Sequence, residues 1–283
     1  MISYFPTIYP DELLYSQLAR YYAKSGYAAY INAAKDLYQR KTVRPDMEFV
    51  NAFTPDALRM ITKDMTMEDV VLKHTMFPYY GRFLPRERKQ KVFQAMVSMQ
   101  GNYHDLLPIP HNQDEGRFLR YCPLCSAEDR ENLGETFWHR THQMIGLNTC
   151  PIHKCSLHNS SIPIKGKASP MLKTAEEVIP LVEEVTYSNN DLECHVAEYM
   201  AEVFHADVNL ENNIEVSQLF QQYVTRSKYC SASGQQRNMG LLYNDFVKFY
   251  QAMTNIRLSE LWQFRKLFIN ARFYFDEICL YGR

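Results

Sequence analysis

Two short cysteine-containing motifs constrain this chain more than any other feature of its sequence. Cys122-Pro-Leu-Cys125 and Cys150-Pro-Ile-His153 are separated by 24 residues, a spacing typical of a structural zinc site. Each motif can direct two donors to one side of a tight loop, so that the two loops together complete a tetrahedron around one Zn²⁺. Three thiolates and one imidazole leave no open position for water. We therefore expect one structural zinc ion that stabilises the fold and catalyses no reaction.

The fourth ligand is the open point of this prediction. His153 repeats the two-residue gap of the first motif and is the preferred ligand. Cys155 could replace it or could be a neighbouring thiol, and His139, His142 and His158 are further donors nearby in the sequence. The alternative to any metal site is a set of ordinary buried cysteines, since free cysteine packs like a small hydrophobic residue. The stretch between the motifs is polar and turn-rich, so no core helix is expected there.

Size and composition indicate a globular intracellular protein. The 283 residues are 46% hydrophobic, enough to bury one large core or two to three smaller ones. The N-terminus lacks the basic and apolar regions of a signal peptide, and no apolar stretch approaches the about 20 residues of a membrane span. The seven cysteines do not form a pattern typical of disulfides. We expect a cytoplasmic protein with no membrane partner.

The charges are distributed unevenly along the chain. The formal net charge is only -1, yet residues 174–225 contain eleven acidic residues and no Lys or Arg. The flanking segments are correspondingly basic, and such segments can present positive faces to a polyanion despite a near-neutral total. The acidic block by itself is interpreted as a solvated helical face.

Helical patterns dominate the N-terminal part. An acidic start at Asp11 is followed by leucines at helical spacing, and Gly26 ends the pattern. A second apolar-periodic segment covers residues 27–38. Together they predict a helix, a glycine turn and a helix, which is compatible with a helix-turn-helix unit or with an αα-hairpin that has no DNA role.

Further helices are expected downstream of this unit. Thr54 as N-cap and Pro55 at the first position predict a short helix, and residues 67–75 and 85–99 predict two more. Residues 101–117 read as a linker, because they contain two prolines and several polar residues.

The densest basic cluster of the chain lies at the start of the 85–99 helix. Its members are Arg82, Arg86, Arg88, Lys89 and Lys91, next to Tyr79, Tyr80 and Phe83. Cations beside aromatic rings suit phosphate contacts with adjacent stacking. An exposed helix start without a ligand is the equally simple interpretation.

The C-terminal part is also expected to be helical. Helices are predicted near residues 172–186, 191–206, 216–226, 235–253 and 258–280. Those at 216–226 and 235–253 form a second helix-turn-helix-like unit, whose second helix begins with Gln235, Gln236, Arg237 and Asn238. Side chains of these types read base edges from the first turn of a recognition helix. A polar helix start with nothing to read is the alternative.

The predicted fold is therefore mainly α, with three parts. Residues 1–110 form a helical N-terminal domain with a helix-turn-helix-like unit, residues 111–165 a small zinc-finger module, and residues 166–283 a helical domain with the second such unit.

Several motifs of the first 160 residues occur in a characteristic order. They are Phe5-Pro, Tyr9, Asp11-Glu-Leu-Leu-Tyr-Ser16, Arg20, Phe77-Pro-Tyr-Tyr80, Arg120-Tyr-Cys-Pro-Leu-Cys125, Gly134-Glu-Thr-Phe-Trp138, Arg140 and Cys150-Pro-Ile-His153. In this order they resemble the TniQ/TnsD family of transposon target-site selection proteins. The chain lacks the second cysteine motif pair of the CRISPR-associated relatives, so it is most similar to the N-terminal part of the TnsD-like branch.

The resemblance implies a non-catalytic adaptor that binds double-stranded target DNA. Such an adaptor recruits an AAA+ ATPase regulator, which in turn activates the transposase. The zinc ligands carried over from the family are Cys122, Cys125, Cys150 and His153.

Two other classes compete with the adaptor. One is a zinc-stapled scaffold for protein interactions that touches no DNA and whose acidic block binds a basic partner. The other is a zinc hydrolase or nucleobase deaminase, which needs an open metal position and a placed glutamate. The deaminase signature begins with H-x-E, and this chain contains no such triplet.

Overall fold

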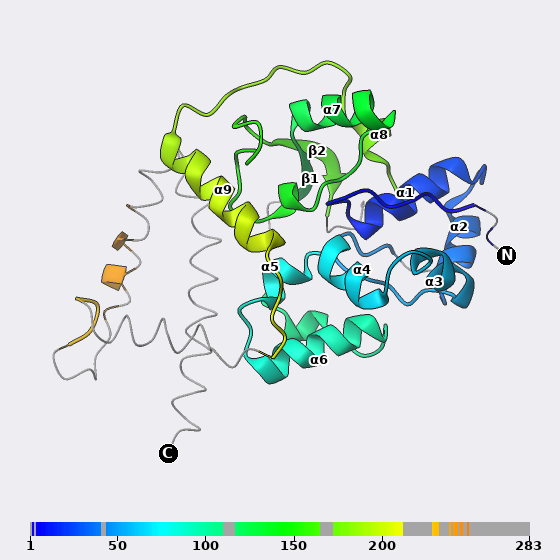
Figure 1. Ribbon diagram of the computed structural model, residues 1–283, viewed down its shortest axis with the longest axis horizontal. Coiled ribbons are helices and arrows are strands. Elements are labelled where there is room, and N and C mark those ends of the chain that lie inside the picture. The colour runs from blue at the N-terminus through cyan, green and yellow to red at the C-terminus, as the bar shows by residue number, and fades with distance from the viewer. Residues whose placement is uncertain are drawn as a thin grey trace.

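The computed structural model describes residues 2, 4–40, 44–109, 117–164 and 172–211, and also residues 228–231, 238, 240–242, 244, 245 and 248. As predicted, helices dominate this part of the chain, and a small two-stranded sheet lies among them (Figure 1). Within the described residues, no helix is both long and apolar enough to cross a bilayer.

The helices before residue 100 lie to the right of and below the two-stranded sheet in the view of Figure 1. They are α1 (Leu14–Lys24), α2 (Tyr30–Leu37), α3 (Pro55–Ile61), α4 (Met67–His74), α5 (Phe77–Gly81) and α6 (Arg86–Val97), followed by the short 3-10 helix η1 (His104–Leu106). The predicted helix, turn and helix at residues 11–38 correspond to α1 and α2, and Gly26 between them has a φ of 72°, a conformation that glycine adopts without strain. The assignment of α1 and α2 as a DNA-reading unit stays a prediction.

Local capping explains where α3 and α4 begin. The Thr54 side chain accepts a hydrogen bond from the Ala57 amide and Pro55 follows it, as the sequence indicated. At α4, Thr66 and Asp69 form a capping box, in which each side chain binds the other's backbone amide. Such caps satisfy amides that have no partner inside the helix.

The region around the two cysteine motifs contains the sheet. Strand β1 (Phe118–Tyr121) pairs antiparallel with β2 (His158–Pro163), with Tyr121 opposite His158. Between the motifs the structure departs from the predicted turn-rich stretch. The 11-residue helix α7 (Pro123–Leu133) begins within the first motif, with Cys122 as N-cap and Pro123 at its first position, and ends at Gly134. The short 3-10 helix η2 (Thr141–Gln143) follows.

The helix predicted near residues 172–186 is wrong for most of its length. Only α8 (Ala175–Val178) forms, after a capping box of Thr174 and Glu177. Pro180 follows closely and cannot donate a helical hydrogen bond. The chain then extends, because the Ser156 amide donates to the Thr186 carbonyl and the Ser188 amide to the Lys154 carbonyl, at 2.8 Å each. We call residues 179–188 the strap.

The helix predicted near residues 191–206 is confirmed as α9 (Asp191–His205), which the Asn190 side chain caps. It packs against α5. The helices expected at 216–226 and 258–280 lie outside the described residues, as does most of the one at 235–253.

A short backbone pairing joins the start of α1 to the segment after α7. The Leu13 amide donates to the Trp138 carbonyl at 2.9 Å, and the Arg140 amide donates to the Asp11 carbonyl at 2.8 Å. Trp138 is fully buried, and its amide also donates to the Ser16 hydroxyl. These contacts cross the predicted domain boundary near residue 110, and the domain boundaries themselves stay predictions.

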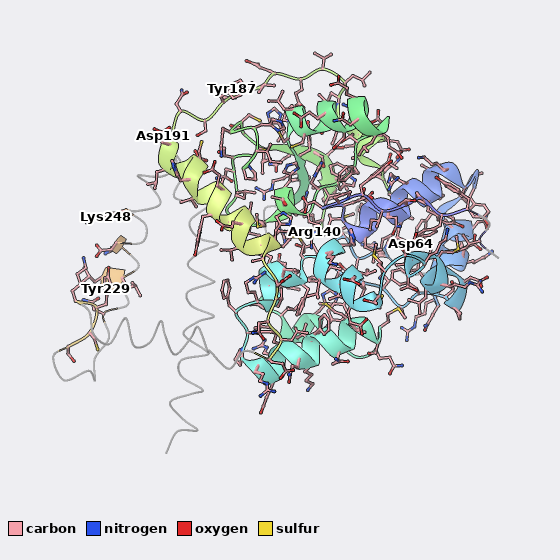
Figure 2. All side chains as sticks on the ribbon, in the orientation of Figure 1. Asp64, Arg140, Tyr187, Asp191, Tyr229 and Lys248 are labelled. Atoms are coloured by element: carbon pink, nitrogen blue, oxygen red, sulfur yellow. The ribbon has the colours of Figure 1, made fainter. Side chains whose placement is uncertain are left out.

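Buried charges surround this pairing. Arg20 binds the buried Glu12 carboxylate through two nitrogens, at 2.8 and 2.9 Å. Arg140 lies centrally in the described part of the chain (Figure 2). It donates to the Asp11 carboxylate and to two carbonyls at the end of α4. Buried charges are tolerated only when they are paired in this way.

His139 occupies the centre of the same network. Its Nε2 lies 3.0 Å from an Asp129 carboxylate oxygen, and its Nδ1 lies 3.6 Å from Asp11. Burial alone lowers the pKa of His139, but the hydrogen bonds and charges of Asp11 and Asp129 outweigh it and raise the pKa to about 10. Although burial raises the pKa of Asp11, His139 and Arg140 hold it well below its usual range. The folded protein therefore keeps a charged imidazolium between two carboxylates.

We predict that this network makes stability depend on pH above neutrality. Because the pKa of His139 is raised in the folded state, its contribution is complete below about 6.5 and is lost as the pH rises through about 10. His139→Gln should lower the free energy of unfolding at pH 6.5 by about 2 to 5 kcal/mol. In urea denaturation, the difference in unfolding free energy between variant and wild type should become smaller toward pH 10. A gap that stays constant with pH would contradict the charged His139.

Candidate metal centre

The first cysteine motif is positioned by the junction of β1 and α7. Cys122 directly follows the strand and caps the helix, and Cys125 lies in the first helical turn. Pro123 fixes the backbone between them at a position where its missing amide costs nothing. Both sulfur atoms therefore lie at the same helix end.

The second motif forms a tight turn before β2. The Cys150 amide donates to the Cys155 carbonyl at 2.7 Å, and the Lys154 amide donates back to the Cys150 carbonyl at 2.9 Å. Lys154 closes the turn with a φ of 56°. This turn directs the Cys150 and His153 side chains toward the first motif.

The two motifs bring four donors together. The ligand atoms of Cys122, Cys125, Cys150 and His153 all lie within 4.8 Å of one another. The Cys125 and Cys150 sulfurs are 3.7 Å apart, and His153 Nδ1 lies 3.6, 3.3 and 3.8 Å from the Cys122, Cys125 and Cys150 sulfurs. A tetrahedral site with Zn–S bonds of 2.3 Å and a Zn–N bond near 2.1 Å requires separations of about 3.6 to 3.8 Å. The cluster can therefore hold a metal ion.

The surroundings of the cluster suit charged sulfur ligands. All three cysteines are buried, and the Cys125 and His153 amides each point at the sulfur three residues earlier, at 3.5 Å. Leu124, Leu157 and Val185 of the strap pack against the cluster. Amides directed at a thiolate favour its charged form, and an apolar shell keeps water away.

Glu128 is a functional residue that the sequence analysis missed. Its carboxylate lies 2.9 Å from His153 Nε2, on the far side of the ring from the cluster. A carboxylate in this position fixes the tautomer of a metal-bound histidine and leaves Nδ1 free to bind the ion. Glu128 lies three residues after Cys125, about one helical turn along α7. This spacing points to a role beside the cluster only once α7 is known to be a helix.

The other donors named in the sequence analysis have different positions. His139 lies between two carboxylates, and His158 Nδ1 lies 2.8 Å from Glu183. His142 is buried near Cys150, and its burial lowers its pKa. Cys155 is buried with its sulfur 3.3 Å from Cys122, so it is a fifth thiol in contact with the four donors.

Three members of the basic cluster bind the segment after α9. Arg82 donates to the carbonyls of residues 204, 206 and 207, where α9 ends. Lys89, which is buried, donates to the Asn209 carbonyl, and Arg86 pairs with Glu211. Cations at a helix C-terminus satisfy carbonyls that have no partner in the helix. In the described structure these side chains hold α9 and its extension.

The remaining predicted DNA contacts lie elsewhere. Arg88 donates to the Leu106 carbonyl, and Lys91 is exposed on α6. Gln235, Gln236 and Arg237 fall outside the described residues. Asn238 is exposed, and its side chain accepts a hydrogen bond from the Leu241 amide, as an N-cap does. The contacts of both sets with DNA stay predictions.

Comparison with known proteins places the site in a family context. The family model described as TniQ matches residues 3–157, which include both cysteine motifs. The chain is 28% identical over 158 residues to the transposon Tn7 transposition protein TnsD of Escherichia coli. That alignment covers 53% of this chain and 30% of the relative, so the chain matches only about a third of the relative's length.

We predict one tightly bound metal ion per chain, and the thiolate-rich donor set favours Zn²⁺. Cys122→Ser and His153→Ala should lose the ion, whereas Cys155→Ser should retain it, as measured by mass spectrometry of purified protein. Cys194→Ser, in α9 and half-buried, is the matched control. A full zinc content in Cys122→Ser would refute the site. If Cys155→Ser loses the zinc ion and His153→Ala retains it, the fourth ligand is the Cys155 thiolate.

Proposed function

The chain belongs to the TniQ family, and on this premise we propose that it selects target DNA for the insertion of a Tn7-like transposon. The match over residues 3–157 and the similarity to Tn7 TnsD carry this proposal. We propose further that it acts as a cytoplasmic adaptor without catalytic activity of its own.

The metal has a structural role in this proposal. Three thiolates and an imidazole complete a tetrahedron, so bound Zn²⁺ would have no open position for a substrate. Its ligands come from the start of α7 and from the turn before β2, and Val185 of the strap packs on them. The ion would fix these three segments relative to one another and so present a rigid surface.

Target recognition would use contacts with double-stranded DNA. We propose that Gln235, Gln236, Arg237 and Asn238 read base edges, because they lie together at an expected helix start. Exposed cations such as Lys91 would contact phosphates. Arg82 and Lys89 are less suited to that task, because their nitrogens already bind backbone carbonyls.

The proposed partners are an AAA+ ATPase regulator and, through it, the transposase. A scaffold without direct DNA binding is the second candidate, and the observation that favours it is the use of Arg82, Arg86 and Lys89 in contacts within the chain. Binding to duplex DNA separates the two.

We predict that duplex DNA binds the purified chain and that the affinity falls steeply with salt. If about five phosphates are contacted, the logarithm of the binding constant should fall with a slope of about -4.5 against the logarithm of the salt concentration. Fluorescence anisotropy between 50 and 300 mM salt measures this slope. No binding at low salt, or an affinity that is flat in salt, would favour the scaffold.

We predict that Arg237 contributes to sequence discrimination. Arg237→Ala should reduce the difference in binding free energy between target and unrelated DNA by about 1 to 3 kcal/mol. Lys91→Ala is the matched control, since loss of a phosphate contact should weaken all sequences equally and reduce the salt slope by about 1. Equal weakening of all sequences by Arg237→Ala would place that residue on the backbone of the DNA.

A further inference from the structure

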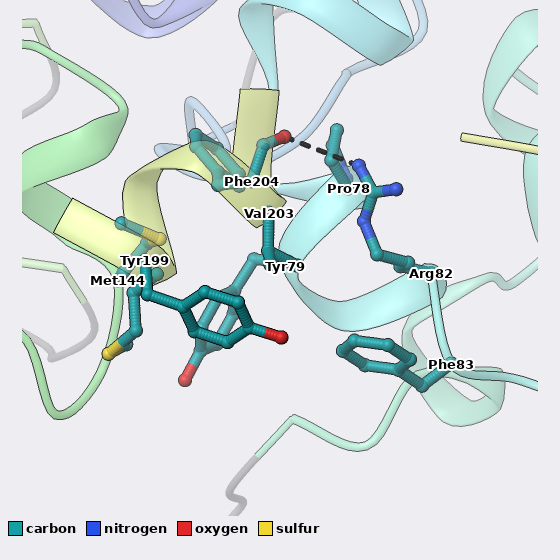
Figure 3. A pocket seen from close by; sticks show the side chains of 9 residues that line it. Pro78, Tyr79, Arg82, Phe83, Met144, Tyr199, Val203 and Phe204 are labelled. Carbon is teal, nitrogen blue, oxygen red and sulfur yellow. Dashed lines mark hydrogen bonds between the residues drawn. The ribbon is translucent and has the colours of Figure 1, made fainter. Parts of the chain in front are cut away.

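An apolar groove lies between α5 and α9, and none of the four metal-binding candidates lines it. Its volume is about 210 Å³, and its lining includes Tyr79, Phe83, Met144, Tyr199, Met200 and Val203. Figure 3 shows the Tyr199 ring extending from α9 toward Phe83 at the groove opening. Aromatic and methionine side chains of this kind are enriched at the centres of protein interfaces.

Two aromatic rings of the groove remain open to solvent. Tyr199 is 66% exposed and Phe83 is 56% exposed, although the same groove is also lined by the buried Phe204. Tyrosine and phenylalanine lose little conformational entropy on binding and bury a large area, so such a pair is a strong anchor.

The groove walls are fixed before any partner binds. Arg82 holds the end of α9 through the carbonyls of residues 204, 206 and 207. The Arg140 guanidinium lies over the Phe204 ring at 4.8 Å, and the Tyr79 hydroxyl donates to the Ile145 carbonyl at 2.9 Å. Binding of a partner therefore carries no entropic cost for ordering this surface.

Charge decides between a nucleic-acid and a protein occupant. Glu202 does not line the groove, but it is exposed on α9 three residues after Tyr199, and residues 174–211 contain no Lys or Arg. Arg82, on the opposite wall, is already bound to carbonyls. An acidic helix beside the groove repels phosphates and attracts a cationic segment.

We propose that this groove is the docking site for the AAA+ ATPase regulator, which inserts an apolar side chain from a segment containing Lys or Arg. The inference rests on the proposed function, and it adds the surface and the chemistry of the partner. Tyr199 and Phe83 anchor the apolar side chain, and Glu202 pairs with the cation beside it.

The test measures binding of the full chain to the purified ATPase encoded by the same transposon, with a non-hydrolysable ATP analogue and without DNA. Tyr199→Ala and Phe83→Ala should each weaken binding by about 10- to 100-fold. Glu202→Lys should weaken it by about 5- to 10-fold, most strongly at low salt. Because the three side chains are exposed, the thermal unfolding midpoint should stay near that of the wild type.

Matched controls lie on the strap. Tyr187 is 59% exposed and Glu184 is exposed, and Figure 2 places Tyr187 on the extended segment before α9. Tyr187→Ala and Glu184→Lys should leave the affinity for the ATPase unchanged.

The outcomes distinguish this inference from the function on which it rests. A wild-type chain that does not bind the ATPase overturns the proposed recruitment, and the docking site with it. A wild-type chain that binds, with groove variants that bind equally well, overturns the docking site alone. Groove variants that lose affinity for DNA and keep the ATPase would also overturn it, since the groove would then bind nucleic acid.

Discussion

The pairing of residues 11–13 with residues 138–140 is the contact on which the rest of the structure depends. Two backbone hydrogen bonds join segments more than 120 residues apart, and they place the partly buried Asp11 and His139 and the buried Arg140 in one charge network. Closing so long a loop costs entropy, and the buried charges cost desolvation unless each finds its partner. The geometry is therefore tightly specified, because a shifted register would leave several ionised groups unpaired at once. α1, the end of α4 and the segment after α7 are held together here.

What could be predicted from the sequence was local. The Thr54 cap and the helices α4, α6 and α9 follow from short-range patterns whose physical causes lie within a few residues. The grouping of Cys122, Cys125, Cys150 and His153 follows from two such short motifs and their spacing. What could not be predicted involved distant partners. The strap is extended because residues 186 and 188 pair with 156 and 154, and no local pattern encodes that choice. Glu128 and the charge network around His139 were missed for the same reason, since their partners become neighbours only through the fold.

The basic and acidic segments of the sequence contact each other within the molecule. The basic cluster at residues 82–91 meets the part of the acidic block that directly follows α9, where Arg82 and Lys89 bind backbone carbonyls and Arg86 pairs with Glu211. A cluster of like charges in a sequence is thus not by itself a ligand site, because its side chains can be paired with other groups of the folded chain. These contacts are also what fixes α9 against α5 and so shapes the groove.

The strap connects the metal centre to α9 by covalent continuity. Its residues 186–188 pair with the turn that supplies His153, Val185 packs on the cysteine cluster, and α9 begins only three residues later. The direction in which α9 starts is therefore inherited from a turn that the ion would close. In folding terms, metal loading would order the turn first, and the strap and the start of α9 would take their direction from it.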